Sequence, residues 1–108
     1  MNKRPNIIFI QNDHQAFYQW QEWKETVQRP NFERLAAEGA EFTSAYCTTP
    51  LCGPTRRSLL TGQYPHAHKQ YFNYSDPPFE QEVYLDTLAE AGYENYYYGK
   101  WHAGPGNA

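Results

Sequence analysis

Cysteine is scarce in this 108-residue sequence, and its scarcity excludes two classes of small protein. Only Cys47 and Cys52 are present. Two cysteines are too few for a disulfide-stabilised scaffold or for a zinc site with four cysteine ligands. Their spacing permits a disulfide, but such a bond is not expected in a reducing compartment. Cys52 is therefore either a buried, inert thiol or a residue used for chemistry.

Long apolar runs are also missing. The longest run spans residues 7–10, whereas a membrane helix needs about 18 apolar residues. Residues 1–5 have the positive start of a signal peptide but not the apolar stretch of about 7–15 residues that must follow it. We therefore expect no membrane partner and a cytoplasmic location, unless the natural chain starts further upstream.

The sequence also lacks an excess of positive charge. Nine Lys and Arg residues against twelve Asp and Glu give a formal net charge of −3. This balance argues against a strongly basic nucleic-acid-binding protein, so no nucleic-acid partner is expected. Aromatic residues, by contrast, are abundant at 18%, including ten tyrosines. Disordered linkers are poor in aromatic residues, so the chain is expected to fold.

The order of the expected elements predicts the fold class. The unbroken apolar run at residues 7–10 suits a parallel strand buried on both faces, and Pro30 and Gly39 bracket a helix. Strands are expected over residues 6–11, 41–46 and 93–98, and helices over residues 30–38, 54–61 and 81–91. This order favours an α/β fold with a largely parallel sheet flanked by helices. Three strands make a thin sheet, so the chain resembles the first portion of a larger domain.

Polar residues follow two of the expected strands. Asp13 and His14 come after the first, and Lys100 and His102 come after the last. Ligands of open α/β sheets bind at the carboxyl ends of strands, so these two clusters are expected at one edge of the sheet.

A cysteine and an arginine lie at the start of the second expected helix. Cys52 lies two residues before the expected helix, and Arg56 follows one turn after Cys52. A helix N-terminus favours an anion through its free N–H groups and its dipole. Together with the cations that follow the last strand, this pattern predicts a site for a tetrahedral oxyanion such as sulfate or phosphate.

The residues around Cys52 resemble the signature of the sulfatase family. Residues 52–62 read CGPTRRSLLTG, similar to the family's Cys-x-Pro-Ser/Ala/Thr-Arg core followed by Leu-x-Thr-Gly. Three further segments resemble the family in the same order: residues 5–13 a first strand and metal-binding acid, residues 30–39 a first helix, and residues 99–104 a Gly-Lys-Trp-His-x-Gly motif. Four ordered matches are far more specific than any one alone.

The resemblance implies a fold and a reaction. It implies an alkaline-phosphatase-like α/β fold, with residues 1–108 forming the N-terminal part of a single catalytic domain whose remainder is absent. It also implies sulfuric ester hydrolysis by formylglycine, formed from Cys52 by a formylglycine-generating or sulfatase-maturating enzyme. One hydroxyl of the hydrated aldehyde, activated by a divalent cation, attacks sulfur, and the other then drives the release of sulfate. The substrate would be a sulfate ester of a small molecule or carbohydrate.

The resemblance also implies roles for individual residues. Asp13 and the modified Cys52 would bind the cation, which is Ca²⁺ or another divalent ion such as Mg²⁺ or Mn²⁺. Arg56 would hold the formylglycine hydroxyl. Lys100 would contact a sulfate oxygen, and His102 would hydrogen-bond the hydrated aldehyde, so both would also bind substrate.

Two positions depart from the common pattern or match it weakly. His14 stands where many sulfatases carry a second acidic metal ligand, which leaves its part in metal binding open. Asn73 has a spacing from Gly62 that resembles a substrate-binding Asn of some members.

Several alternatives remain open on the sequence. The same groups could hydrolyse a phosphate or phosphonate monoester, or the chain could be a non-catalytic fragment. Residues 1–108 alone are expected to be inactive, because the family's C-terminal metal ligands and second sulfate-binding lysine fall beyond them. Arg57 is expected at the surface, either exposed or at the rim of the substrate site. His66 and His68 have a spacing seen in metal sites, although a role in loop structure is favoured.

Overall fold

The structure is a computed structural model that describes residues 4–16, 22, 25–75 and 77–105. The chain divides into two units, residues 1–45 and residues 46–108, and each is treated separately below. Among the described residues, none of the helices combines the length and apolarity that crossing a bilayer requires.

The first unit contains helix α2, Pro30–Glu38. Its bounds are those predicted from the sequence, with Pro30 in the first turn and Gly39 directly after the last. Its apolar face is open: Phe32 is 48% exposed and Leu35 62%. Local signals therefore predict the helix correctly, whereas the burial of its face depends on a partner.

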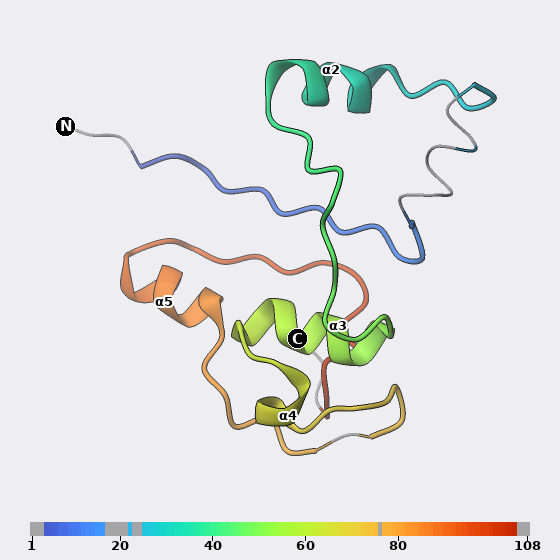
Figure 1. Ribbon diagram of the computed structural model, residues 1–108. Coiled ribbons are helices and arrows are strands. Elements are labelled where there is room, and N and C mark those ends of the chain that lie inside the picture. Colours follow the sequence, from blue (N-terminus) through green and yellow to red (C-terminus); the bar gives the residue numbers. More distant parts are fainter. Residues whose placement is uncertain (1–3, 17–21, 23–24, 76, 106–108) are drawn as a thin grey trace. The chain divides into compact units, whose positions relative to one another are not determined.

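The second unit is built around helix α3, Cys52–Thr61, which contacts both α4, Pro65–His68, and α5, Tyr84–Glu90 (Figure 1). Helix α3 begins two residues before the predicted start and ends where predicted. Its end is fixed by Gly62, which has φ 67° and donates its N–H to the Ser58 carbonyl. Helix α5 is shorter at both ends than expected, and α4 is not anticipated by the sequence pattern.

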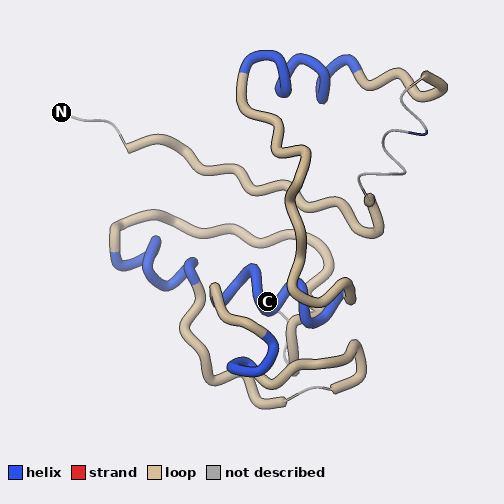
Figure 2. Tube along the Cα trace, viewed as in Figure 1, coloured by secondary structure: helices blue, strands red, loops and turns tan. Residues whose placement is uncertain are grey.

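No strand occurs within the described residues (Figure 2), so the three expected strands are not confirmed. Residues 7–10 are extended and between 57% and 82% exposed, and Tyr96 and Tyr98 of the last expected strand are also exposed. A strand is defined by hydrogen bonds to a neighbouring strand, and no described segment supplies those bonds to these residues. The apolar patterns alone cannot create them.

The interior of the second unit is unusually polar. Its buried apolar side chains, among the residues described, are Pro54, Leu60 and Ala103. The larger buried side chains are polar or charged, namely Arg56, Arg57, His68 and Gln70. Buried polar groups destabilise a fold unless they are hydrogen-bonded, and the side chains of Arg56, Arg57 and His68 are hydrogen-bonded to neighbours that they hold in defined positions.

Candidate functional site

The candidate site begins at the N-terminus of α3. Cys52 is the first residue of the helix and is half-buried. Leu51 precedes it in an extended conformation and provides no side-chain cap. Arg56 lies one turn along the helix, on the same side as Cys52, and is only 7% exposed. A cation and the first N–H groups of a helix thus lie next to the cysteine.

Arg56 ties α3 to the segment that carries the other two candidate catalytic residues. Its Nη1 donates a hydrogen bond of 2.6 Å to the main-chain oxygen of Lys100. The hydroxyl of Tyr97 donates to the same oxygen, also at 2.6 Å. Lys100 is exposed, so its side chain lies at the surface while its backbone is fixed. The hydrogen bond from Arg56 therefore holds two residues close together that are 44 positions apart in the sequence.

His102 has a backbone conformation that residues other than glycine rarely adopt, with φ 50°. Its Nε2 lies 3.1 Å from the main-chain oxygen of Asn73. The side-chain oxygen of Asn73 accepts the N–H of Gly53 at 2.9 Å. The second unit therefore brings together Cys52, Arg56, Lys100, His102 and Asn73, the site residues that the sequence places within it.

Gly53 is required by close packing next to the cysteine. A Cβ atom at this position would lie 2.6 Å from Nε2 of Gln70 and 3.1 Å from the main-chain oxygen of His102. Gln70 is fully buried, and neither atom of its amide has a hydrogen-bond partner among the described residues. The glycine therefore lets the loop after α4 and the segment around His102 approach the start of α3.

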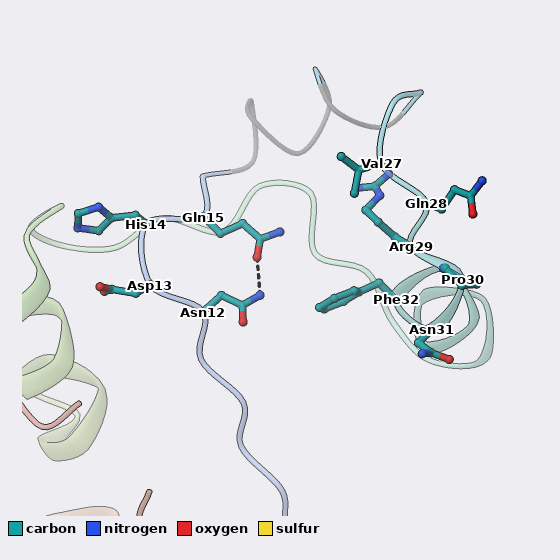
Figure 3. A pocket seen from close by; sticks show the side chains of 10 residues that line it. All are labelled: Asn12, Asp13, His14, Gln15, Val27, Gln28, Arg29, Pro30, Asn31 and Phe32. Atoms are coloured by element: carbon teal, nitrogen blue, oxygen red, sulfur yellow. Dashed lines mark hydrogen bonds between the residues drawn. The ribbon is translucent and has the colours of Figure 1, made fainter. Parts of the chain in front are cut away.

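Asp13 and His14 belong to the first unit. Both are exposed, and His14 adopts a positive φ of 57°. They line a pocket of about 730 Å³ between residues 12–15 and residues 27–32, in which Phe32 points toward Asn12 (Figure 3). The side chains of Asn12 and Gln15 are hydrogen-bonded to each other across the turn.

The donor atoms of this turn differ in their fit to a metal ion. The carboxylate of Asp13 provides the oxygen ligands that calcium and magnesium require, whereas the imidazole of His14 suits softer transition metals. Asp13 therefore fits a hard cation, and His14 fits the role of a ligand to calcium poorly.

Arg57 is the residue whose position differs most from the sequence-based expectation. The expected location is the surface, but the side chain is fully buried. Its Nη1 donates to the main-chain oxygens of Pro77 at 3.0 Å and Ala103 at 3.5 Å. Its Nη2 donates to the Pro78 oxygen at 2.5 Å and to Oε1 of Gln81 at 2.7 Å. The guanidinium also lies 4.6 Å from the centre of the Phe79 ring, a cation–π contact.

A signal for the burial of Arg57 exists in the sequence. Pro54, Arg57 and Leu60 are spaced by three residues, so they share one face of α3, and all three are buried. Arg57 thus binds the loop of residues 77–81 and the segment around Ala103 to that face. Burial lowers the pKa of its guanidinium, and Glu80 partly opposes this effect. The side chain nevertheless remains charged at neutral pH.

His68 is engaged in a way that excludes the metal site considered from its spacing to His66. It is fully buried, its Nε2 lies 2.9 Å from the hydroxyl oxygen of Ser58, and its Nδ1 accepts the N–H of Gln70 at 3.2 Å. Because Nδ1 accepts a hydrogen bond, Nε2 carries the proton of the neutral ring and donates it to Ser58. Both ring nitrogens are occupied, so His68 links α4 to α3 and has a structural role.

The complete protein should lose stability in mild acid because of His68. Burial lowers the pKa of this imidazole, and the charges of Arg57 and His66 lower it further. Because the pKa is lower in the folded state, protons bind the unfolded state more tightly. The free energy of unfolding is therefore highest above about pH 6.5 and decreases as the pH falls below that value. We expect the thermal unfolding midpoint to fall between pH 7 and pH 5 more steeply than in His68→Asn, whose amide can accept the Gln70 N–H without titrating. Equal slopes would contradict a role for His68.

Comparison with known proteins gives a consistent result. The sulfatase family model matches residues 5–108. The chain is 37% identical to an N-acetylglucosamine-6-O-sulfatase of Bacteroides thetaiotaomicron over 93% of its length. It is 35% identical to an ulvan-active sulfatase of Formosa agariphila over 92%, and 41% identical to an extracellular sulfatase SULF-1 homolog of Drosophila melanogaster over 92%.

The alignments cover only a small part of these relatives. The chain corresponds to 18% of the Bacteroides protein, 20% of the Formosa protein and 9% of the Drosophila protein. No solved structure shows a significant match to the chain. The resemblance inferred from residues 52–62 and the three accompanying segments is nevertheless confirmed by a family match over nearly the whole chain. The chain belongs to the sulfatase family.

Proposed function

We propose that the protein containing this chain hydrolyses sulfuric esters, with formylglycine formed from Cys52 as the nucleophile. The observation that carries the proposal is the hydrogen bond from Arg56 to the main chain of Lys100, at 2.6 Å. It joins the helix that begins with Cys52 to the segment bearing Lys100 and His102. A nucleophile precursor, two cations and an imidazole are thereby assembled within one folded unit, as transfer of a sulfuryl group requires.

Each candidate residue of the second unit has its own proposed role in the reaction. Arg56, buried and fixed through one guanidinium nitrogen, orients the group formed at residue 52. The ammonium group of Lys100, on an exposed side chain, contacts a sulfate oxygen and balances its negative charge. The Nε2 of His102 is committed to Asn73, so its Nδ1 is the nitrogen that exchanges a proton with the reacting group. Formylglycine, once formed and hydrated, supplies the attacking hydroxyl.

A divalent cation, which we propose to be calcium, completes the site. Asp13 has an exposed carboxylate that fits a hard ion, and residue 52 would be a second ligand after modification. Calcium usually takes six to eight oxygen ligands, so other parts of the complete protein and water would supply the rest. The bound ion would lower the pKa of the attacking hydroxyl and stabilise negative charge on oxygen. In the alkaline-phosphatase-like fold, residues 6–11 and 93–98 would be strands of one largely parallel sheet.

The substrate class follows from the relatives. Their names include sulfatases of N-acetylglucosamine and N-acetylgalactosamine at the 6-O position and of ulvan. We therefore propose a sulfated carbohydrate as the substrate, and a formylglycine-generating or sulfatase-maturating enzyme as the partner that modifies Cys52.

The proposal is tested by producing the complete protein together with a formylglycine-generating enzyme. The peptide containing residue 52 should change in mass from cysteine to formylglycine, and the purified protein should hydrolyse an aryl sulfate in a manner that a calcium chelator inhibits. Faster hydrolysis of the phosphonate ester of the same phenol would favour the phosphonate alternative. Complete conversion of Cys52 without hydrolysis of either ester would refute the proposed activity.

A further inference from the structure

Asn73 is placed to connect two parts of the candidate site. The first four N–H groups of a helix have no partner within it, and Leu51 does not cap α3. The side-chain oxygen of Asn73, 20 residues away in the sequence, accepts the Gly53 N–H at 2.9 Å. Asn73 therefore acts as the missing cap next to Cys52.

The main chain of the same residue binds His102. A carbonyl oxygen can only accept, so the 3.1 Å contact between the Asn73 oxygen and His102 requires the proton to be on Nε2. In the neutral ring Nδ1 then carries the lone pair, and this atom is buried without a hydrogen-bond partner among the described residues. Asn73 thereby selects the tautomer in which Nδ1 can accept a proton.

The backbone of His102 needs such support. Its φ of 50° is unfavourable for a residue with a side chain. Arg56 binds the chain before it, at Lys100, and Arg57 binds the chain after it, at Ala103. Asn73 provides the contact to the imidazole itself, and it is also the residue that contacts the start of α3.

We propose that Asn73 is a positioning residue, which sets the relative placement of residue 52 and His102 and does not bind substrate. This inference rests on the proposed function, because it assigns Asn73 a part in the same reaction. It differs from the substrate-binding role suggested by the spacing of Asn73 from Gly62, because the side-chain oxygen of Asn73 caps Gly53 and its main-chain oxygen binds His102.

The test compares Asn73→Ala with Asn73→Asp in the complete, formylglycine-containing protein. Alanine removes the acceptor for Gly53, so kcat should fall by about 10- to 100-fold, the effect of misplacing reacting groups by up to about 1 Å, while KM changes less than about twofold. Aspartate keeps an oxygen at this position and should recover at least part of kcat. The proposal would be overturned by a rise in KM as the main effect, with Asn73→Asp more impaired than Asn73→Ala through repulsion of the sulfate.

A second measurement separates failure of this inference from failure of the proposed function. Hydrogen exchange of the Gly53 amide should be faster in Asn73→Ala and close to wild type in Asn73→Asp, whether or not the protein hydrolyses a sulfate ester. Asn95→Ala is the matched control, because Asn95 is exposed and its side chain donates to the Leu85 oxygen of α5 instead. Unchanged exchange at Gly53 in Asn73→Ala would contradict the capping contact.

Discussion

Replacing Cys52 with alanine in the complete protein should reduce sulfate ester hydrolysis to the background rate, a loss of at least about a thousandfold. Alanine cannot be converted to formylglycine, so the covalent pathway is lost, and removal of a catalytic nucleophile lowers turnover by about 10³-fold or more. The fold should survive, because alanine has the highest helix propensity and residue 52 is the first residue of α3. Initial rates on an aryl sulfate and the thermal unfolding midpoint measure the two effects.

The second cysteine supplies the control for this experiment. Cys47 is exposed and lies outside the helix in the same unit, so Cys47→Ala should retain wild-type activity and leave the mass change at residue 52 intact. If Cys52→Ala remains active, or if both variants lose activity equally, the assignment of Cys52 as the nucleophile precursor is wrong.

Replacing Arg57 with alanine should have the largest effect on stability. The substitution leaves the main-chain oxygens of Pro77 and Pro78 without their donor and opens a cavity beneath the Phe79 ring. A hydrogen bond to a charged group is worth about 1.5–3 kcal/mol, so loss of two or more should destabilise the protein by more than about 3 kcal/mol. Thermal unfolding and the yield of soluble protein would show this loss.

A conservative variant and a surface variant make the Arg57 prediction specific. Arg57→Lys keeps the charge but not the planar guanidinium, whose two terminal nitrogens donate hydrogen bonds to the main-chain oxygens of Pro77 and Pro78. It should therefore restore only part of the stability. Arg34→Ala on α2, where the arginine is exposed, should change stability by no more than about 0.5 kcal/mol. An Arg57→Ala protein as stable as the Arg34→Ala protein would show that the buried contacts contribute little.

The ends of the helices show which features can be predicted from nearby residues. The bounds of α2 and the end of α3 follow from Pro30, Gly39 and Gly62, residues that act on the backbone conformation at their own positions. Helix α4 escapes prediction because its four residues carry no periodic pattern, and its end depends on Lys69 at φ 65°, a conformation that favours glycine or asparagine. No expected strand forms within the described residues, because a strand needs hydrogen bonds from a neighbouring strand and a local apolar pattern does not supply them.

The residues of this chain are enough to assign its family. The spacing of Cys52, Pro54 and Arg56, together with the segment that contains Lys100 and His102, was sufficient to predict the family, because catalytic groups must be of particular types at particular spacings. It could not determine which of these groups meet, since nothing in a local pattern specifies which distant residue will approach.

The support of the site depends on contacts that form when the chain folds. The buried guanidinium of Arg57, the neutral ring of His68 and the two contacts of Asn73 all join residues separated by 10 to 46 positions, except for the local bond from Gln70 to His68. A polar side chain in a sequence is by default expected at the surface. Arg57 and His68 are buried because folding supplies their hydrogen-bond partners, and those partners exist only once the chain has folded.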